Sequence, residues 1–396
     1  MEDLSRCVHH PDVSHAGFAS LTVPTYRAST IVFADVESYV KRKHRGPDGY
    51  SYGLHGTPTT RTLEAQLSAL ERAERTVLVP SGQAAVTIVF LSVLSPGDRV
   101  LIPDTVYPPV KGFCQNFLQP RGIDFEVYDP MIGGDIAELI DGRTRLVWVE
   151  SPGSTTMEFQ DLPAIVRAAH ARGALVGCDN TWATPLLFKP LVHGADFSAE
   201  ALTKYVGGHS DILMGSISVR DVALHRRLKD TMRMIGIGVS PDDVALALRG
   251  LETMGVRLAH MGRIATEFAQ RIHEMPAAQR VLHPALPSCP GHEIWKRDFA
   301  GVSSVFSVVL NAQAEQRVDQ ALAAVKLFSI GASWGGTHSL IVPMSVTSER
   351  IFPPGTGYGT ILRISIGLED PGELWSELET LFRSLNGEQE LATKVG

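Results

Sequence analysis

The stretch ALTKYVGGHSD, residues 201–211, places a single lysine, Lys204, among small and apolar residues. Thr203 precedes the lysine, and a Gly-Gly-His-Ser-Asp run follows closely after it. A lone lysine is usually a solvated side chain whose aliphatic stem lies along the surface. A desolvated lysine instead has a lowered pKa and can form a Schiff base with a carbonyl group. Both interpretations fit this stretch, and the rest of the chain decides between them.

Short apolar runs alternate with helical patterns over residues 60–180. We expect strands at 76–80, 98–103, 125–129, 145–150 and 174–179, and helices at 60–73, 84–94 and 160–173. The last helix has Asp161 as a candidate N-cap, Pro163 near its first turn and Gly173 as a candidate stop. Alternating strands and helices imply βαβ units, so the predicted fold class is α/β with a mostly parallel central sheet.

The pattern changes after about residue 240. The later part carries a long amphipathic helix at 256–272, strands at 304–310 and 362–367, and further helices at 318–328 and 372–385. Elements without dense alternation suggest a smaller α+β domain. The predicted organisation is therefore an irregular N-terminal arm (1–55) reaching a neighbouring subunit, a large domain (56–240) and a smaller C-terminal domain (241–396).

Composition excludes several classes of protein. The 396 residues are 44% hydrophobic and 20% charged, with a net charge of −7, and no basic cluster provides a nucleic-acid footprint. No apolar run approaches the roughly 20 residues that span a bilayer, and the polar N-terminus has no apolar core of a signal peptide. The four cysteines are far apart, which argues against a zinc site or a disulfide framework. We predict a reduced, cytoplasmic protein that binds neither nucleic acid nor membrane.

Two features fall at the carboxyl ends of expected strands, where open parallel sheets bind ligands. Ser81-Gly82-Gln83 joins a strand to a helix, and its backbone N–H groups would suit a phosphate, although an ordinary βα turn is the simpler explanation. Asp179 closes the strand ALVGCD and is equally compatible with an N-cap or a functional carboxylate. Together with Lys204, a phosphate cradle and a strand-end carboxylate are the parts that a pyridoxal phosphate (PLP) site needs.

The segment DFSAEALTKYVGGHSD (196–211) closely resembles the lysine signature of the Cys/Met-metabolism PLP-dependent enzymes, the cystathionine lyase and synthase family. The resemblance continues, in order, through YGLHGTPTTRTLEAQLSALE, PSGQAAV, DTVYPPVKGFC, VWVESPGSTTME, CDNTWATPLLFKPLVHGAD, HPALPSCPGHEIWKRDFAG, SWGGTHSL and LRISIGLED. The DNTWAT and HPALPSCPGHEIWKRDFAG segments are most similar to bacterial cystathionine β-lyases. The resemblance implies PLP as the cofactor and an aspartate aminotransferase-like, fold type I architecture. It also implies a homo-oligomer, at least a dimer and by expectation a tetramer built as a dimer of dimers.

The resemblance also implies cofactor-binding roles for matching residues. Lys204 would bind the cofactor and remove the substrate Cα proton, and Asp179 would pair with the pyridine nitrogen. Tyr107 would stack on the ring, with its hydroxyl near the substrate amine. The phosphate would be held by Gly82, Gln83 and Thr203.

The substrate-binding roles follow from the same resemblance. Arg363 would clamp the substrate α-carboxylate, a bidentate match that arginine suits better than lysine. Ser333 and Trp334 would line the same pocket. Tyr52 would come from the neighbouring subunit to contact phosphate and substrate. Without the resemblance, Tyr107 and Trp334 would more simply be residues that pack in the core, and Arg363 a member of a surface ion pair.

The implied reaction is β-elimination from L-cystathionine or a related cysteine S-conjugate, releasing a thiol (homocysteine from cystathionine), pyruvate and ammonia. The alternatives within the family are γ-elimination, γ-replacement and a specialised lyase for another cysteine thioether. A nicotinamide-dependent dehydrogenase is weakly supported, because IGIGVS (235–240) lacks the third glycine of GxGxxG. A serine hydrolase is also weak, because the chain contains no GxSxG.

Three places depart from the family pattern and bear on the substrate. Two residues after Tyr52, where the family commonly has a phosphate-binding arginine, this chain has Leu54 followed by His55. His338 replaces the acid of a Gly-Gly-x-Glu-Ser-Leu segment. Near Tyr107, where close relatives carry an acid, this chain has Lys111 and Gly112. These changes predict that the distal half of the natural substrate differs from that of cystathionine.

Overall fold

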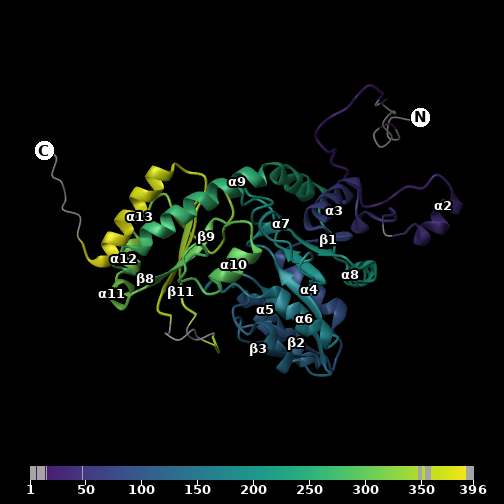
Figure 1. The fold of residues 1–396 in the computed structure, drawn as a ribbon. Helices are drawn as coiled ribbons and strands as arrows, with labels where there is room; N and C mark the ends of the chain where they lie inside the picture. Colours follow the sequence, from purple (N-terminus) through teal and green to yellow (C-terminus); the bar gives the residue numbers. More distant parts are fainter. Residues whose placement is uncertain are drawn as a thin grey trace.

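The computed structural model describes Arg6, Ser14 and residues 16–46, 48–346, 350–352 and 358–388. Two sheets organise the chain (Figure 1). The larger sheet has seven strands in the order β1-β7-β6-β5-β4-β2-β3. Its strands are β1 (Arg75–Val79), β2 (Arg99–Pro103), β3 (Asp124–Tyr128), β4 (Thr144–Glu150), β5 (Leu175–Asp179), β6 (Phe197–Glu200) and β7 (Gly215–Val219).

The second sheet has five strands in the order β10-β11-β12-β9-β8. These are β8 (Ala278–Leu282), β9 (Val305–Leu310), β10 (Ser329–Ile330), β11 (Leu340–Met344) and β12 (Ile361–Ser365). All of its pairs are antiparallel except β10 with β11. The larger sheet, in contrast, is parallel apart from β7, which runs against both β1 and β6. The predicted α/β class, with a mostly parallel sheet and a smaller α+β part, is confirmed.

Helices cover both sheets. They are α2 (Val36–Val40), α3 (Pro58–Glu71), α4 (Gly82–Val93), α5 (Pro108–Phe113), α6 (Leu162–Ala171), α7 (Thr184–Leu187), α8 (Val222–Ile235), α9 (Pro241–His273), α10 (His292–Asp298), α11 (Ala312–Glu315), α12 (Val318–Leu322) and α13 (Pro371–Asn386). Single turns of 3₁₀ or π helix lie at Lys41–His44, Gly53–His55, Cys114–Leu118, Gln119–Arg121 and Gly133–Glu138. Within the described residues, no helix is both long and apolar enough to cross a membrane.

The 33-residue helix α9 connects the two sheets. It contacts α3 at one end and β8, β9 and α13 at the other, so it runs along one side of the whole molecule (Figure 1). Its start is fixed by Ser240, whose side chain accepts from the N–H of Asp242, and by Pro241 in the first turn. The periodicity at 256–272 therefore captured only the second half of a helix that begins fifteen residues earlier.

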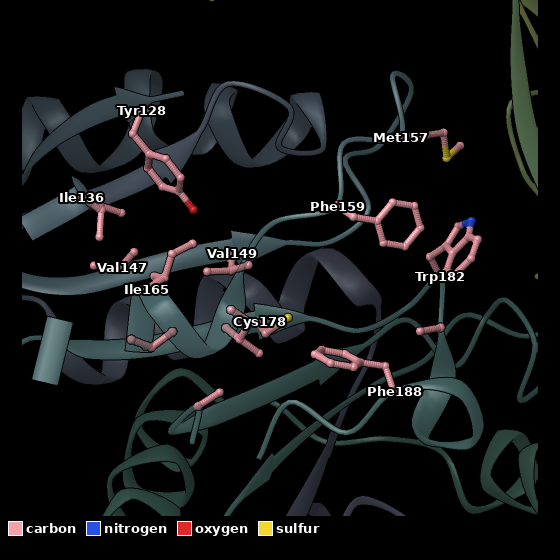
Figure 2. Close-up of a cluster of buried hydrophobic side chains, with 14 of the residues drawn as sticks. Tyr128, Ile136, Val147, Val149, Met157, Phe159, Ile165, Cys178, Trp182 and Phe188 are labelled. Carbon is pink, nitrogen blue, oxygen red and sulfur yellow. The ribbon is translucent and has the colours of Figure 1, made fainter. Parts of the chain in front are cut away.

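A buried cluster supports the strand ends of the larger sheet. Val149 and Cys178 lie on neighbouring strands β4 and β5, and the rings of Phe159, Trp182 and Phe188 gather beyond them (Figure 2). Phe159 and Trp182 meet edge to face, with ring centroids 5.5 Å apart. The Trp182 indole N–H donates to the carbonyl of Val305 on β9 at 3.2 Å, which ties this end of the larger sheet to the smaller one.

The expected helix at 318–328 is wrong beyond Leu322, where α12 ends. The Glu377 carboxylate on α13 accepts hydrogen bonds from the backbone N–H groups of Lys326, Leu327 and Phe328, at 2.6–3.0 Å. These amides would otherwise bond carbonyls one helical turn earlier. A side chain more than forty residues away thus draws them out of the helix and leads the chain into β10.

Candidate active site

Lys204 lies in the turns that connect β6 to β7, at the carboxyl ends of the parallel strands. Its amine donates to the Ser333 hydroxyl at 2.8 Å and lies 5.2 Å from the centre of the Trp334 ring. Burial lowers the pKa of Lys204 to about 8, helped by the nearby positive charge of Arg363 and opposed by Asp179. A lysine with this pKa is roughly one-tenth neutral at pH 7 and half neutral at pH 8, and the neutral form is the one that acts as a nucleophile or base.

Asp179 ends β5 with its carboxylate buried beside Lys204. Its Oδ1 accepts a hydrogen bond from the N–H of Thr181 at 2.9 Å. Burial raises the pKa of Asp179, while the hydrogen bonds of Thr181 and the charge of Lys204 lower it. A cationic group placed against this carboxylate would favour its ionised form.

The helix α4 begins at the same edge of the sheet. Its N-cap, Ser81, accepts from the N–H of Ala84 at 3.0 Å, which leaves the first amides of the helix without partners inside it. A Cβ on Gly82 would lie 2.5 Å from the Cβ of Ala201, so the turn can pass the β6–β7 segment only with glycine there. A Cβ on Gly215, at the start of β7, would likewise lie 2.4 Å from the Ser81 carbonyl oxygen.

Two polar side chains border this helix start. The Thr203 hydroxyl donates to the Met214 carbonyl at 3.2 Å and accepts from the Met214 N–H at 3.1 Å, which holds it in place. The Gln83 amide nitrogen donates to the Pro109 carbonyl at 3.1 Å, whereas its buried carbonyl oxygen has no hydrogen-bond partner. The edge therefore presents unpaired helix amides, the donor set that a phosphate requires.

Arg363 reaches the cavity from β12 of the smaller sheet. It is 6% exposed, and its guanidinium donates to the Ala332 carbonyl at 2.5 Å. Among the described residues it contacts no carboxylate, and burial lowers its pKa. Leaving a buried guanidinium without a counter-ion is costly, so its place in the cavity favours an anionic ligand.

A cavity of about 240 Å³ collects most of the predicted site residues. Those that line it are Gly82, Gln83, Tyr107, Asp179, Thr203, Lys204, Trp334 and Arg363. Tyr107 and Trp334 contribute ring surface, and the Tyr107 N–H donates to the buried carboxyl group of Glu150 at 2.7 Å. Ser333 contacts the cavity through its hydrogen bond to Lys204.

Tyr52 lies outside this chain's own cavity. Its side chain is 49% exposed and borders a different hollow, beside His55 and α8. The residues that depart from the family pattern also lie outside the Lys204 cavity. Gly112 lines an adjacent hollow of about 520 Å³ that shares Ser154 with the cavity, and His338 is exposed and bonded to Thr337.

The family model for Cys/Met metabolism PLP-dependent enzymes matches residues 5–383. The chain belongs to this family. Members depend on PLP, so PLP is the cofactor of this enzyme, and its substrate is a small amino acid.

Individual relatives cover nearly the whole chain. A Rhizobium johnstonii protein, provisionally named a cystathionine β-lyase, is 43% identical over 91% of this chain and 90% of its own. An L-alanine/L-glutamate racemase from Wolbachia pipientis is 36% identical over 92% of this chain and 93% of its own. The structure of cystathionine γ-synthase from Xanthomonas oryzae, in complex with aminoacrylate and cysteine, superposes with a TM-score of 0.84. It is 27% identical and covers 94% of this chain and 96% of its own.

The cavity of this PLP-dependent enzyme fits its cofactor chemically. The unpaired amides at the start of α4 suit a phosphate, and the crowding at Gly82 keeps side chains out of that place. Asp179 offers a carboxylate for a protonated ring nitrogen, and Lys204 offers an amine for an aldehyde. The fit therefore rests on three different groups, the amides, the carboxylate and the amine, from three segments of the chain.

Sequence reasoning missed several lining residues, among them Glu150, Ser154 and Trp182. Glu150 could have been found, because it ends the strand RLVWVE as Asp179 ends ALVGCD. Burial raises the pKa of Glu150 well above its usual range, as does the nearby charge of Asp179. Ser154 and Trp182 stand in the quoted segments VWVESPGSTTME and DNTWAT, but neither ends a strand, so no strand-end pattern marked them.

Proposed function

We propose that this PLP-dependent enzyme is a carbon–sulfur β-lyase that acts on L-cystathionine or a related cysteine S-conjugate. The products are a thiol (homocysteine from cystathionine), pyruvate and ammonia. The observation that supports this most is one cavity that holds both a lysine with a lowered pKa and a buried arginine that pairs with no carboxylate among the described residues. The name of the Rhizobium relative supports the choice of β-lyase.

In this proposal the residues at the sheet edge hold the cofactor. Lys204 would bind its aldehyde, Asp179 would pair with its ring nitrogen, and Tyr107 would stack on the ring. Gly82, Gln83 and Thr203 would hold the phosphate. The bound cofactor supplies an electron sink, which makes the Cα proton acidic and allows the Cβ–S bond to break.

The substrate is oriented by residues of the smaller sheet. Arg363 binds the α-carboxylate through two of its guanidinium nitrogens, a geometry suited to carboxylates. Ser333 and Trp334 form the wall beside it, and Ser333 already contacts the Lys204 amine. Fixing the carboxylate fixes the Cα–H bond relative to Lys204, which contributes orientation rather than chemistry.

Proton transfer is assigned to Lys204 Nζ, which takes the Cα proton in its neutral form. Its pKa of about 8 places it close to the working pH, where a general base is most effective. The Tyr107 hydroxyl is assigned to the substrate amine. The exposed position of Tyr107 at the first turn of α5 leaves its ring accessible to a ligand in the cavity.

We further propose that Tyr52 serves the neighbouring subunit's site, since it is 49% exposed in its own chain and lines no part of its own Lys204 cavity. This requires at least a dimer, and we propose a tetramer of two dimers. We also keep the division into an arm (1–55), a large domain (56–240) and a smaller domain (241–396). Cytoplasmic location stays a prediction.

The product distinguishes this function from its rivals. β-Elimination of cystathionine yields pyruvate, γ-elimination yields 2-oxobutyrate, and a racemase yields the D-amino acid without a keto acid. Purified enzyme should be incubated with cystathionine, several cysteine thioethers and L-alanine, and all three product types measured. Pyruvate from a thioether as the main product is the expected result, and either other product as the main one would replace the proposal.

A further inference from the structure

A second hollow, of about 630 Å³, lies between the N-terminal arm and helix α8. We call it the α8 pocket. Its lining carries five basic side chains, those of Arg42, Arg61, Arg226, Lys229 and Arg233. One carboxylate, Asp230, belongs to the same lining. Such an excess of positive charge is unusual in a chain whose net charge is −7.

The positive charges of the α8 pocket are only partly neutralised. Lys229 lies 3.3 Å from Glu64, and Arg233 lies 3.1 Å from Asp230. Arg226 makes no ion pair or side-chain hydrogen bond with any described residue. Arg61 pairs with Glu64 through one terminal nitrogen, but its buried Nε has no partner. The pocket therefore keeps donors available for an anion.

The pKa values of two histidines in the pocket are lowered, in part by the same positive charges. Burial lowers the pKa of His225 to about 4, followed by the charges of Lys229, Arg75 and Arg61, with Asp48 opposing. Burial also lowers the pKa of His55, again assisted by Lys229. Both imidazoles are neutral at pH 7, so they add hydrogen-bonding capacity without adding repulsion.

The composition of the lining favours a phosphate over a smaller anion. Guanidinium and ammonium groups stand together with the hydroxyls of Ser51 and Tyr52, and the space exceeds that of a single ion. Leu54, on the same arm, adds no charge to the stretch 52–55, so Arg42 is the cation that the arm contributes to the lining. Helix α8 supplies Arg226, Lys229 and Arg233 from an independent part of the chain.

We propose that the α8 pocket binds a phosphate monoester through Arg226, Lys229 and the hydroxyl groups of the arm. Two sources carry this chemistry. One is the cofactor phosphate of the neighbouring subunit, an assignment that rests on the proposed role of Tyr52. The other is a separate phosphorylated small molecule.

The test compares wild-type enzyme with the Arg226→Gln/Lys229→Gln double variant. Arg167→Gln is the matched control, because Arg167 is exposed on α6, outside the pocket. Binding of radiolabelled inorganic phosphate to the PLP-loaded enzyme is measured by equilibrium dialysis. The affinity of the cofactor-free enzyme for PLP, and the ³¹P resonance of bound PLP, are measured alongside. Loss of charge-assisted bonds should weaken the affected ligand about tenfold or more.

If the pocket binds a separate phosphorylated molecule, the PLP-loaded wild-type enzyme should bind additional phosphate, and only the double variant should lose this binding. If the pocket instead binds the neighbouring subunit's cofactor phosphate, the loaded enzyme should bind no additional phosphate. The double variant should then bind PLP more weakly and show a shifted ³¹P resonance. If the double variant differs from the control in neither measurement, the proposal is overturned. Because Lys229 also pairs with Glu64, Arg226→Gln alone provides a variant that breaks no described contact. These readouts measure binding, so they stand whichever product the enzyme forms.

Discussion

Two buried arginines in the same region of the chain have opposite surroundings. The Arg350 side chain is 6% exposed and lies 2.9 Å from Asp104 and 3.1 Å from Glu158, and it also donates to Thr156 at 2.6 Å. Arg363 is also buried, but among the described residues its guanidinium forms a hydrogen bond only with the Ala332 carbonyl. Burial opposes the charge of Arg350, yet Glu158 and Asp104 raise its pKa overall, whereas burial lowers the pKa of Arg363.

The difference separates a structural charge from a functional one. Arg350 joins the segment after β11 to loops of the larger sheet, and its charge is satisfied within the chain. Arg363 lies one strand later, beside Lys204, and its charge is left for a ligand. Removing Arg350 should therefore damage the fold, and removing Arg363 should damage the reaction.

The largest expected effect comes from substituting Lys204, which lies in the same cavity as Arg363. Lys204→Ala removes the proposed base and the cofactor's attachment, so we expect turnover to fall about 10³-fold or more. The visible absorbance band of the lysine-bound cofactor should disappear as well. Both are measured on purified protein with added PLP. A variant that keeps the band would show that another group holds the cofactor.

Arg350→Met should lower the free energy of unfolding by about 3–5 kcal/mol, because it leaves Glu158 buried without a counter-ion and leaves Asp104 with Lys111 alone, at 3.7 Å. Urea denaturation of the PLP-loaded enzyme measures this. The matched control is the triple variant Arg350→Met/Asp104→Asn/Glu158→Gln, which removes the charges together and should recover much of the loss. If Arg350→Met unfolds at the same midpoint urea concentration as the wild-type enzyme, Arg350 does not have the structural role assigned to it.

Arg363→Gln should lower kcat/KM about 10²-fold, because the substrate carboxylate loses a buried, charge-assisted partner. The free energy of unfolding should stay unchanged or rise by about 1 kcal/mol, since an uncompensated buried charge is removed. Steady-state kinetics and urea denaturation together give both values. Arg363→Lys should be intermediate in activity, because lysine keeps the charge but not the bidentate geometry. If Arg363→Gln lowers the free energy of unfolding but not the activity, Arg363 has a structural role like that of Arg350.

The smallest effect is on pH dependence. Only the neutral amine of Lys204 can capture the cofactor aldehyde, and its pKa is about 8 in the cofactor-free chain. The capture rate, followed by stopped-flow absorbance, should rise about tenfold per pH unit below that value and level off above it. Arg363→Gln should move the midpoint upward, because the Arg363 charge helps to lower the pKa of Lys204. A wild-type rate that keeps rising past pH ~10 would mean that Lys204 is not desolvated.

The comparison also shows where sequence reasoning stopped. Arg363 could be named from the LRISIG segment, because a motif carries it, but Arg350 stands in no pattern that marks it. Its partners Asp104 and Glu158 lie 246 and 192 residues earlier in the chain. The α8 pocket could not be predicted from the sequence for the same reason. Its charged residues come from three separate segments, the arm, α3 and α8.

The sequence by itself determined the α/β class, the family and most of the residues around the cofactor. Those properties depend on local periodicity, strand ends and short motifs, which the order of residues states directly. Only the tertiary structure decided which buried charges are paired and which are left unpaired. Pairing depends on distances between residues far apart in the chain, as it does for Glu377 and the end of α12. Burial then sets the cost of each unpaired charge, and so distinguishes Arg363 from Arg350.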